Sequence, residues 1–214
     1  MSKSSPSILV PIRSLGENHL ERITQHLLLL EPHDRYLRFG FAANDEQIRR
    51  YAQSLNFSRD ELFGIYNRRL ELIAMAHLAF TTDASLAACA EFGVSVSSQA
   101  RGRGYGSRLF DRAVMHARNE GVSMLFIHAL SENTAMLKIA RQAGALVERS
   151  GSESEAHLRL LPATADTRFN ELLQEQLAQS NYRVKVQIKK FWALLSQLQA
   201  LRTDVIDAQD RCAK

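Results

Sequence analysis

The sequence predicts an α/β (α+β) fold with a mostly antiparallel sheet, followed by a helical C-terminal extension. Three observations support this prediction. Strand-like segments follow one another in the middle of the chain, segments with helical spacing of apolar residues stand before and after them, and the composition changes after Ala163. The 214 residues, 45% of them hydrophobic, are enough to bury a sizeable core. We therefore expect a globular domain over residues 1–163 and a helical extension over residues 164–214.

The N-terminal part is expected to hold one strand and two helices. The segment "ILVPIR" (residues 8–13) is typical of a strand, and "HLERITQHLLLL" (residues 19–30) has apolar residues at helical spacing. A second helix is predicted over "ANDEQIRRYAQSL" (residues 43–55), where Asn44 or Asp45 can cap the free N–H groups.

Three consecutive strands are expected next. The segments "ELFGIYNRR" (residues 61–69) and "LELIAMAHLAF" (residues 70–80) are typical of the two strands of a hairpin. After the polar, turn-like "TTDAS", the segment "LAACAEFGVSVS" (residues 86–97) predicts another strand. Successive strands joined by short connections favour antiparallel pairing.

The second half of the domain alternates helices and strands. A helix is predicted over residues 105–121, and the apolar run "VSMLFIHAL" (residues 122–130) is typical of a strand that is buried on both faces. Another helix is expected over residues 131–144. The segment "ALVERSGSESEAHLRLLP" (residues 145–162) predicts a hairpin around Gly151.

The tail contains no Gly or Pro and is rich in Leu, Gln and Lys. Helical spacing favours a helix, although "YRVKVQI" alternates like a strand. Such a helix either docks on its own domain or pairs with a second chain to form a homodimer. A basic face that touches nucleic acid is the weakest option. The apolar positions of this helix are Ile188, Phe191, Trp192, Leu195, Leu198 and Val205.

Charge and cysteine content narrow the class of protein. The net charge of +4 suits an anionic ligand, but it is not the charge block of a nucleic-acid-binding protein. The two cysteines, Cys89 and Cys212, lack the spacing of a metal or redox site, which favours a reducing compartment and no metal. We see no signal-peptide pattern and no apolar run of about 20 residues, so we expect a cytoplasmic protein without a membrane partner.

A glycine-rich loop joins the third of these consecutive strands to the helix that follows. Free N–H groups at a helix N-terminus attract anions, and arginines add positive charge, so the loop is a candidate pyrophosphate site. The alternative is a tight turn with exposed arginines. No lysine follows the glycines as in a nucleotide P-loop, and the glycine spacing does not fit a dinucleotide fingerprint. The loop reads Arg101, Gly102, Arg103, Gly104, Tyr105 and Gly106.

This loop resembles the Arg/Gln-x-x-Gly-x-Gly/Ala acetyl-CoA motif of the GNAT N-acetyltransferases. The order of the elements is similar over residues 8–162, including a helix opened by Asn133 and closed by Gly144. The resemblance implies a mixed central sheet with helices on both faces, acetyl-CoA as cosubstrate and an amine as acceptor. In this family the segment between the first two helices, here residues 31–40, shapes the acceptor site; a surface ion-pair cluster is the alternative that we slightly favour.

The resemblance also implies roles for individual residues. Amides of the loop over residues 101–106 would bind the pyrophosphate of coenzyme A. The strand before the loop and the strand after the helix splay apart in this family, and pantetheine would pair with the edge formed by Val94, Ser95 and Val96. Asn133 would bind the pantetheine arm or line the thioester pocket, unless it is a simple helix cap.

Acetyl transfer to an amine needs a base, because lysine-like ammonium groups have a pKa near ~10.4. Our candidate is Glu91, a charged residue in the apolar strand "CAEFGVSV", on the face opposite Ala90 and Phe92. The alternative is a solvent-facing Glu on a half-exposed strand. The general acid is open, since Ala140 occupies the position where many family members carry Tyr.

Ser131, His128 or water could substitute for this acid, or the thiolate leaves unassisted. A histidine on an apolar strand is more often a packed side chain than a proton shuttle. The sequence thus predicts an N-acetyltransferase that uses direct transfer to a protein lysine or a small amine. The competing hypothesis is a non-catalytic acetyl-CoA-binding sensor, or a scaffold whose C-terminal helix recruits a partner.

Overall fold

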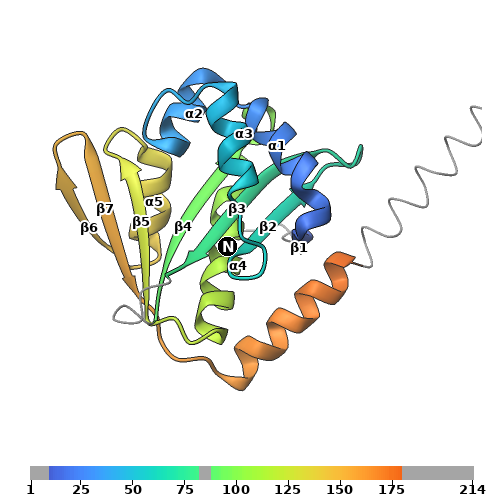
Figure 1. Ribbon diagram of the computed structural model, residues 1–214. Helices are drawn as coiled ribbons and strands as arrows, with labels where there is room; N and C mark the ends of the chain where they lie inside the picture. The colour runs from blue at the N-terminus through green and yellow to red at the C-terminus, as the bar shows by residue number, and fades with distance from the viewer. Residues whose placement is uncertain (1–9, 82–87, 180–214) are drawn as a thin grey trace, which may run out of the picture.

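A computed structural model describes residues 10–81 and 88–179. Their strands form one seven-stranded sheet in the order β1-β2-β3-β4-β5-β7-β6 (Figure 1). All neighbouring strands are antiparallel except β4 and β5, which are parallel, so the predicted mixed and mostly antiparallel sheet is confirmed. The strands are β1 (Ile12–Ser14), β2 (Glu61–Tyr66), β3 (Leu72–Phe80), β4 (Cys89–Val96), β5 (Met124–Leu130), β6 (Leu146–Ser150) and β7 (Glu153–Arg159).

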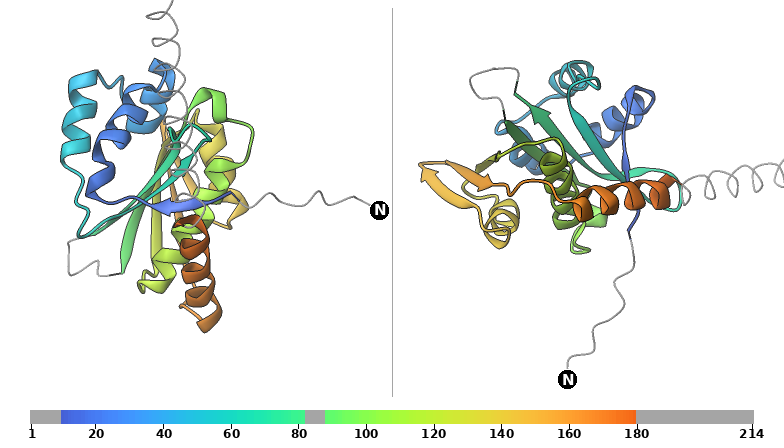
Figure 2. Two further views of the ribbon diagram at one scale, coloured as in Figure 1. Left: turned by 90° about the vertical axis from the view of Figure 1, so that its right-hand side faces the viewer. Right: turned by 90° about the horizontal axis from the view of Figure 1, so that it is seen from below.

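Helices cover both faces of the sheet, as expected (Figure 2). The helices α1 to α3 lie on one face, and α4 and α5 lie on the other. Single 3-10 turns precede α1 and α4, namely η1 (Glu17–His19) and η3 (Ser98–Ala100). The helices are α1 (Leu20–Leu28), α2 (Pro32–Phe39), α3 (Asp45–Gln53), α4 (Tyr105–Asn119) and α5 (Thr134–Gln142).

Each face of the sheet has its own core. Under α4, the rings of Phe92 and Phe110 meet edge to face, with centroids 5.0 Å apart. On the opposite face, Ile23 of α1 and Ile48 of α3 pack with Met75 of β3. Burying apolar surface on both sides fixes the sheet as a rigid central layer.

The side chains of β4 alternate as predicted. Ala90 and Phe92 belong to the core under α4, and Val94 packs against it. The hydroxyl of Ser95 faces α1 instead, where it hydrogen-bonds Nε2 of His26 at 2.9 Å. Residues two apart along a strand share a face, so Glu91 lies on the α1–α3 face with Ser95.

The parallel strands β4 and β5 diverge. They pair only at the start of β4, over Cys89–Met124, Ala90–Leu125 and Glu91–Phe126. By contrast, β4 stays paired with β3 up to Val96. The edge of β4 that faces β5 is therefore open from Phe92 onward, which is the splay that the family resemblance implied.

One helix was not predicted. Residues 31–40 were expected only to connect two helices, but they contain α2 (Pro32–Phe39). Pro32 starts the helix at a position where its missing N–H costs nothing, and Gly40 ends it. This helix packs against β4 and β5, and it thereby closes one side of the gap between them.

Two strand predictions need correction. The first strand begins at Ile12, later than residue 8; residues 8 and 9 lie outside the described ranges. The strand β5 is not buried on both faces, because the side chain of His128 is 56% exposed. Its second half borders the gap beside β4, so solvent reaches it.

The C-terminal extension begins with a helix over residues 165–179, which docks on α4 of the same chain. Glu171 accepts hydrogen bonds from Arg112 at 2.8 Å and from Nδ1 of His116 at 2.6 Å. Glu175 lies 3.4 Å from Arg112 and 3.3 Å from the hydroxyl of Ser14. The predicted apolar positions from Ile188 onward lie outside the described residues.

Candidate functional site

The gap between β4 and β5 opens into two adjoining pockets with volumes of about 640 and 600 Å³. We call the first the Glu91 pocket and the second the glycine-loop pocket. Both are lined by Leu37 and Arg38 of α2, by Val94 of β4, and by Asn133 and Met136 at α5. A molecule in one pocket can therefore meet a molecule in the other beside Val94.

The glycine loop lies at the N-terminus of α4. Gly104 is the N-cap residue with a φ of +72°, and Gly102 has a φ of +73°, a conformation that side chains disfavour. The first N–H groups of a helix have no partner within it, and the helix dipole adds positive character there. All of the predicted cofactor-binding residues except Arg103 line this pocket: Val94, Ser95, Val96, Arg101, Gly102, Gly104, Tyr105, Gly106 and Asn133.

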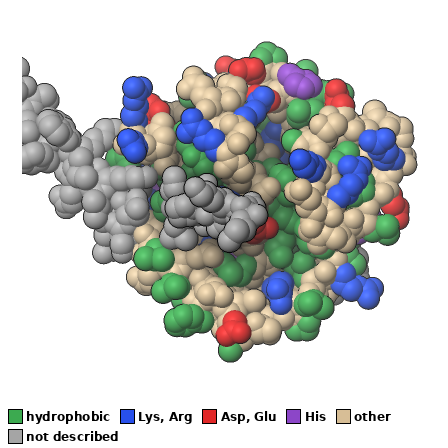
Figure 3. Space-filling model, turned by 180° about the vertical axis from the view of Figure 1, so that it is seen from behind, with side chains coloured by type: hydrophobic (Ala, Val, Ile, Leu, Met, Phe, Trp, Pro, Cys, Tyr) green, Lys and Arg blue, Asp and Glu red, His purple; other side chains and the backbone are tan. Residues whose placement is uncertain are grey.

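Arginines surround this loop without all facing the pocket. Arg101 lines the pocket and forms an ion pair with Asp34 of α2. Arg103, which was predicted to take part in binding, is exposed and is not among the lining residues. The face seen in Figure 3 carries Lys and Arg side chains in separate groups with other surface between them.

Asn133 is the N-cap residue of α5 and also lines the candidate site. Its Oδ1 accepts a hydrogen bond from the backbone N–H of Met136 at 3.1 Å, so it caps α5. Its Nδ2 donates to the carbonyl oxygen of Leu37 at 3.5 Å. The residue also lines both pockets, at the point where they meet.

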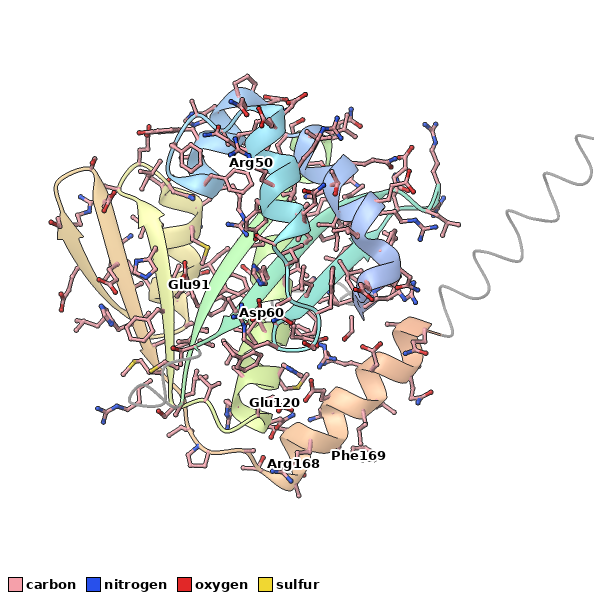
Figure 4. All side chains as sticks on the ribbon, in the orientation of Figure 1. Arg50, Asp60, Glu91, Glu120, Arg168 and Phe169 are labelled. Carbon is pink, nitrogen blue, oxygen red and sulfur yellow. The ribbon has the colours of Figure 1, made fainter. Side chains whose placement is uncertain are left out.

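Glu91 projects into the larger pocket. It is exposed, and Figure 4 labels it between β4 and β5. Its backbone lies opposite Ala79 of β3 and Phe126 of β5, at the last pair before the two parallel strands diverge. A carboxylate at this place faces the opening of the sheet, where an acceptor molecule has access.

A chain of hydrogen-bonded side chains reaches the same pocket, and the sequence analysis missed it. Nε2 of His77 lies 3.1 Å from Oδ2 of Asp60, and Nδ1 of His77 lies 2.9 Å from the hydroxyl of Tyr51. Arg38 donates to that hydroxyl at 2.8 Å. Tyr51 and Arg38 line the Glu91 pocket. These residues come from α2, α3, β3 and the connection before β2, so no short sequence motif contains them.

The pKa values of Asp60 and His77 are both shifted within this set of hydrogen-bonded side chains. Asp60 is buried, which opposes ionisation, but hydrogen bonds from Arg59 and His77 outweigh burial and lower the pKa of Asp60. Burial lowers the pKa of His77, and the nearby Arg38 lowers it further. A carboxylate beside a neutral imidazole is the resulting state near neutral pH.

Arg38 reaches Tyr51 across the backbone of β4. A Cβ atom at Gly93 would lie 2.8 Å from the guanidinium carbon of Arg38, so only glycine leaves room for this path. The guanidinium also lies 5.4 Å from the ring centroids of Phe39 and Tyr51. Such cation–π contacts hold a cation in place over aromatic faces.

Of the positions considered for the general acid, only His128 lines a pocket. Ala140 is fully buried in the core under α4, so this position contributes packing only. Ser131 hydrogen-bonds the hydroxyl of Ser154 at 2.9 Å and lines neither pocket. His128 lines the Glu91 pocket, 3.9 Å from Glu155, and is not the packed side chain that we favoured.

Other site classes find no support in the described ranges. Cys89 is a free, partly buried cysteine. Among residues 10–81 and 88–179 no group of three His, Cys, Asp or Glu side chains is placed to hold a metal ion. None of the helices described there has both the length and the apolar character needed to cross a membrane.

Comparison with known proteins agrees with this geometry. The sequence matches the model of the acetyltransferase (GNAT) family over residues 26–145, which is more than half of the chain. The matched region contains both pocket-forming strands and the glycine loop. No protein of curated function matches the sequence.

Solved structures share the fold at low sequence identity. The GNAT domain of S. lividans PAT superposes with a TM-score of 0.59 at 19% identity, over 70% of this chain and 89% of that one. A ribosomal-protein-alanine N-acetyltransferase from Brucella melitensis gives 0.53 at 17% identity, over 70% and 99%. A protein described as a putative phosphinothricin N-acetyltransferase gives 0.54 at 18% identity, over 72% and 98%.

Proposed function

The chain belongs to the acetyltransferase (GNAT) family and is an acyl-CoA-dependent acetyltransferase; from this premise we propose that it acetylates a primary amine, with Glu91 as general base. The acceptor is a small amine or a protein lysine. The observation that carries the proposal is the junction of the two pockets beside Val94, with the glycine loop on one side and Glu91 on the other.

The glycine-loop pocket fits coenzyme A. Its volume of about 600 Å³, the positive end of α4 and the side chain of Arg101 suit a long ligand with a pyrophosphate. We propose that residues 101–106 hold the pyrophosphate, and that the free edge at Val94, Ser95 and Val96 pairs with the pantetheine amides. Asn133 then lies beside the thioester.

The lining of the Glu91 pocket favours a cationic acceptor. Two arginines, Arg38 and Arg149, are outnumbered by glutamates. Opposite charges lining a cleft attract the substrate and orient it. The glutamates are Glu91, Glu148, Glu153 and Glu155.

Glu91 supplies the first proton transfer in this proposal. Its carboxylate takes a proton from the ammonium, which leaves a nitrogen lone pair free to attack the thioester carbonyl carbon. The C–N bond forms and the C–S bond breaks, with its electron pair going to sulfur. The acetyl group passes directly between the two bound substrates.

A sensor or scaffold is the second candidate, because Ala140 cannot act as the tyrosine acid of many family members. One experiment separates the two hypotheses. The purified chain is mixed with acetyl-CoA and a panel of amines and lysine peptides, and the release of free thiol is followed. Thiol release that depends on an amine supports the enzyme. Binding of acetyl-CoA, seen as a rise in melting temperature, without release for any amine supports the sensor.

The acceptor itself is not fixed by the fold. The neighbours' names mention ribosomal-protein alanine in one case and phosphinothricin in another, on the same architecture. Residues of α2 and of the β6–β7 hairpin line the Glu91 pocket in this chain. We propose that these two elements select the acceptor.

We also propose that the chain forms a homodimer through its C-terminal helix. The described part of that helix exposes four large apolar side chains. Such a patch on a helix is typical of a protein–protein contact. These residues are Phe169, Leu172, Leu173 and Leu177.

A further inference from the structure

We propose that the Tyr51 hydroxyl is a second catalytic group of the acetyl transfer, and that His77 and Asp60 form a proton relay behind it. This inference rests on the proposed function, because it concerns the same reaction in the Glu91 pocket. It assigns a task to a hydrogen-bonded chain that the role of Glu91 does not use.

The chain has a defined direction. Asp60 is an ionised carboxylate held by Arg59 at 2.6 and 2.8 Å, and it accepts a third hydrogen bond from the backbone N–H of Phe80. Because a carboxylate can only accept, Nε2 of His77 carries the hydrogen in their 3.1 Å contact. The Nδ1 atom then has a free lone pair, which accepts the hydroxyl hydrogen of Tyr51 at 2.9 Å.

The Tyr51 oxygen can accept one further hydrogen bond, from a substrate. It donates to His77 and accepts from Arg38 at 2.8 Å, which leaves one of its two lone pairs free. Tyr51 lines the Glu91 pocket together with Gly93 and Val94, next to the junction of the pockets. An N–H group of the acceptor can use this lone pair.

The groups around His77 suit an imidazole that is neutral before the reaction and becomes an imidazolium only during the proton transfer. Arg38 lies at the Nδ1 end of the ring, where it bonds Tyr51, and Arg59 lies at the Nε2 end, where it bonds Asp60; Asp60 and Glu91 supply negative charge. Burial keeps the pKa of His77 below its usual value, so Nδ1 is unprotonated near neutral pH. Once a proton arrives, Asp60 stabilises the imidazolium, as in other carboxylate–histidine pairs.

The chemistry needs a second proton acceptor. Glu91 takes one proton from the ammonium before attack. After attack, the nitrogen of the tetrahedral adduct is cationic and must lose another proton before the amide is formed. In the proposed step this N–H bond breaks and the proton moves to the Tyr51 oxygen. The Tyr51 hydrogen moves at the same time to Nδ1 of His77, and the C–S electron pair leaves with sulfur.

The return path completes the cycle. The proton that the Tyr51 oxygen took from the acceptor nitrogen passes to the thiolate or to water, and the original hydroxyl proton returns from Nδ1 of His77 to the Tyr51 oxygen. No oxidant, reductant or further reactant is required. The positive charge of Arg38 at the same oxygen stabilises any negative charge that develops there during the transfer.

The test compares Tyr51→Phe with the wild type. Phenylalanine keeps the ring that packs edge to face on Phe39, with centroids 5.2 Å apart, and removes only the hydroxyl. We expect kcat to fall by at least about tenfold, a conservative share of what acid–base groups contribute, with the Kd for acetyl-CoA unchanged. The control is Tyr66→Phe, at a buried tyrosine of β2 that lines neither pocket and lies outside the elements proposed to bind the substrates; this variant should keep full activity.

A second variant separates proton transfer from simple positioning. In His77→Asn the amide oxygen can accept the Tyr51 hydrogen bond but cannot take up a proton at neutral pH. A relay predicts that this variant is as slow as Tyr51→Phe, and that the double variant is hardly slower than either. Full activity of His77→Asn would mean that His77 only holds Tyr51 in place, and it would overturn the relay.

The outcomes are distinguishable from failure of the proposed function. A wild-type chain that releases thiol with an amine, together with Tyr51→Phe at the same kcat, contradicts this inference alone. A wild type that acetylates no amine contradicts the proposed function and the relay together. A curved dependence of the wild-type rate on the fraction of D₂O, made linear by Tyr51→Phe, supports two protons moving in one step.

Discussion

Gly93 leaves room for the Arg38 side chain to lie against β4. The ideal Cβ position at Gly93 is 2.8 to 2.9 Å from three atoms of the guanidinium group. Those atoms are the end of a flexible side chain, so an added methyl group should push the guanidinium aside with little effect on the fold. The structure thus makes a glycine in the middle of a strand part of the site, although glycine weakens strands.

Gly93→Ala should therefore lower kcat more than it lowers stability. The displaced Arg38 loses its hydrogen bond to Tyr51, and we expect activity to fall several-fold while the melting temperature changes by no more than a few degrees. Steady-state kinetics and thermal unfolding of the variant measure both quantities. An unchanged kcat would show that the position of Arg38 does not matter to turnover.

Gly104 tests the anion site. Its φ of +72° and its place at the N-terminus of α4 suit a glycine beside a bound pyrophosphate. Gly104→Glu puts a negative charge there, so we expect the affinity for acetyl-CoA to fall by at least about tenfold, measured by calorimetry. Gly104→Asn, which tolerates positive φ and adds no charge, is the matched control. An affinity for acetyl-CoA that is equal in Gly104→Glu and the wild type would contradict the assignment of this loop as the pyrophosphate site.

The residues that the sequence predicts best are those whose role is local. The alternation of β4 places Glu91 and Ser95 on one face directly, and Asn133 is recognisable as a helix cap. Tyr51, His77 and Asp60 have no such signature, because 26 and 17 positions separate the bonded pairs. Only the packing of α3 on the sheet brings them together, which a single sequence does not reveal.

The docked helix over residues 165–179 depends on one buried cluster of charges. Arg112 of α4 is only 2% exposed, and it is compensated by Glu171 and Glu175. Removing one partner of a buried ion pair costs more than the pair itself contributes, because the remaining charge has lost its water. Hydrogen bonds from His116 and Asn119 to Glu171 strengthen the same cluster.

Glu171→Gln should lower the free energy of unfolding by roughly 1.5–3 kcal/mol, the range for hydrogen bonds to a charged group. Urea unfolding measures the change. Asp166→Asn is the control, because Asp166 is exposed on the same helix and should change stability by less than about 0.5 kcal/mol. Equal midpoints for wild type and Glu171→Gln would show that the contact with α4 carries no stability.

The stabilisation that this cluster contributes depends on pH. Burial opposes ionisation of Glu171, but hydrogen bonds from His116 and Asn119 lower its pKa from 4.5 to about 2. Its stabilisation is thus complete above pH 4.5 and is lost as the pH falls toward 2. His116 is buried too, yet its bond to Glu171 raises its pKa, so its stabilisation is complete below 6.5 and is lost above it. Both contributions are present together between pH 4.5 and 6.5.

Helices and strands followed their local patterns more closely than connections did. The hairpin of β2 and β3, the helix α4 and the cap of α3 at Asn44 were all predicted and are confirmed. The helix α2 was missed because its eight residues include one proline and five polar or charged side chains, without a buried residue. Its formation depends on Pro32, Gly40 and contacts with β4 and β5.

Within residues 10–81 and 88–179, large exposed apolar side chains gather on the docked helix. Phe169, Leu172, Leu173 and Leu177 are between 46% and 67% exposed on the docked helix. Sedimentation of the full chain should show a dimer, and Phe169→Ser with Leu173→Ser should shift it toward monomer. Leu29→Ser, which changes a leucine that is 83% exposed beside α1, should leave the dimer intact. A monomeric wild type at micromolar concentration would contradict the homodimer.

The order of elements and the glycine loop were accessible from the sequence because each has a linear signature. The meeting point of the two pockets was not, since it arises where β4 and β5 stop pairing after Glu91 and Phe126. That divergence depends on α2, α5 and the β6–β7 hairpin packing around the gap. The site is a property of the assembled sheet.

Glu91→Gln gives the most direct measurement of the central claim, that the two pockets form one acetyl-transfer site. Thiol release and acetyl-CoA binding are measured on the same preparation. Glutamine keeps the size of the side chain but takes up no proton, so we predict a fall in kcat of at least about a hundredfold with an unchanged Kd for acetyl-CoA. Wild-type turnover in this variant would contradict the assignment of Glu91 as the base.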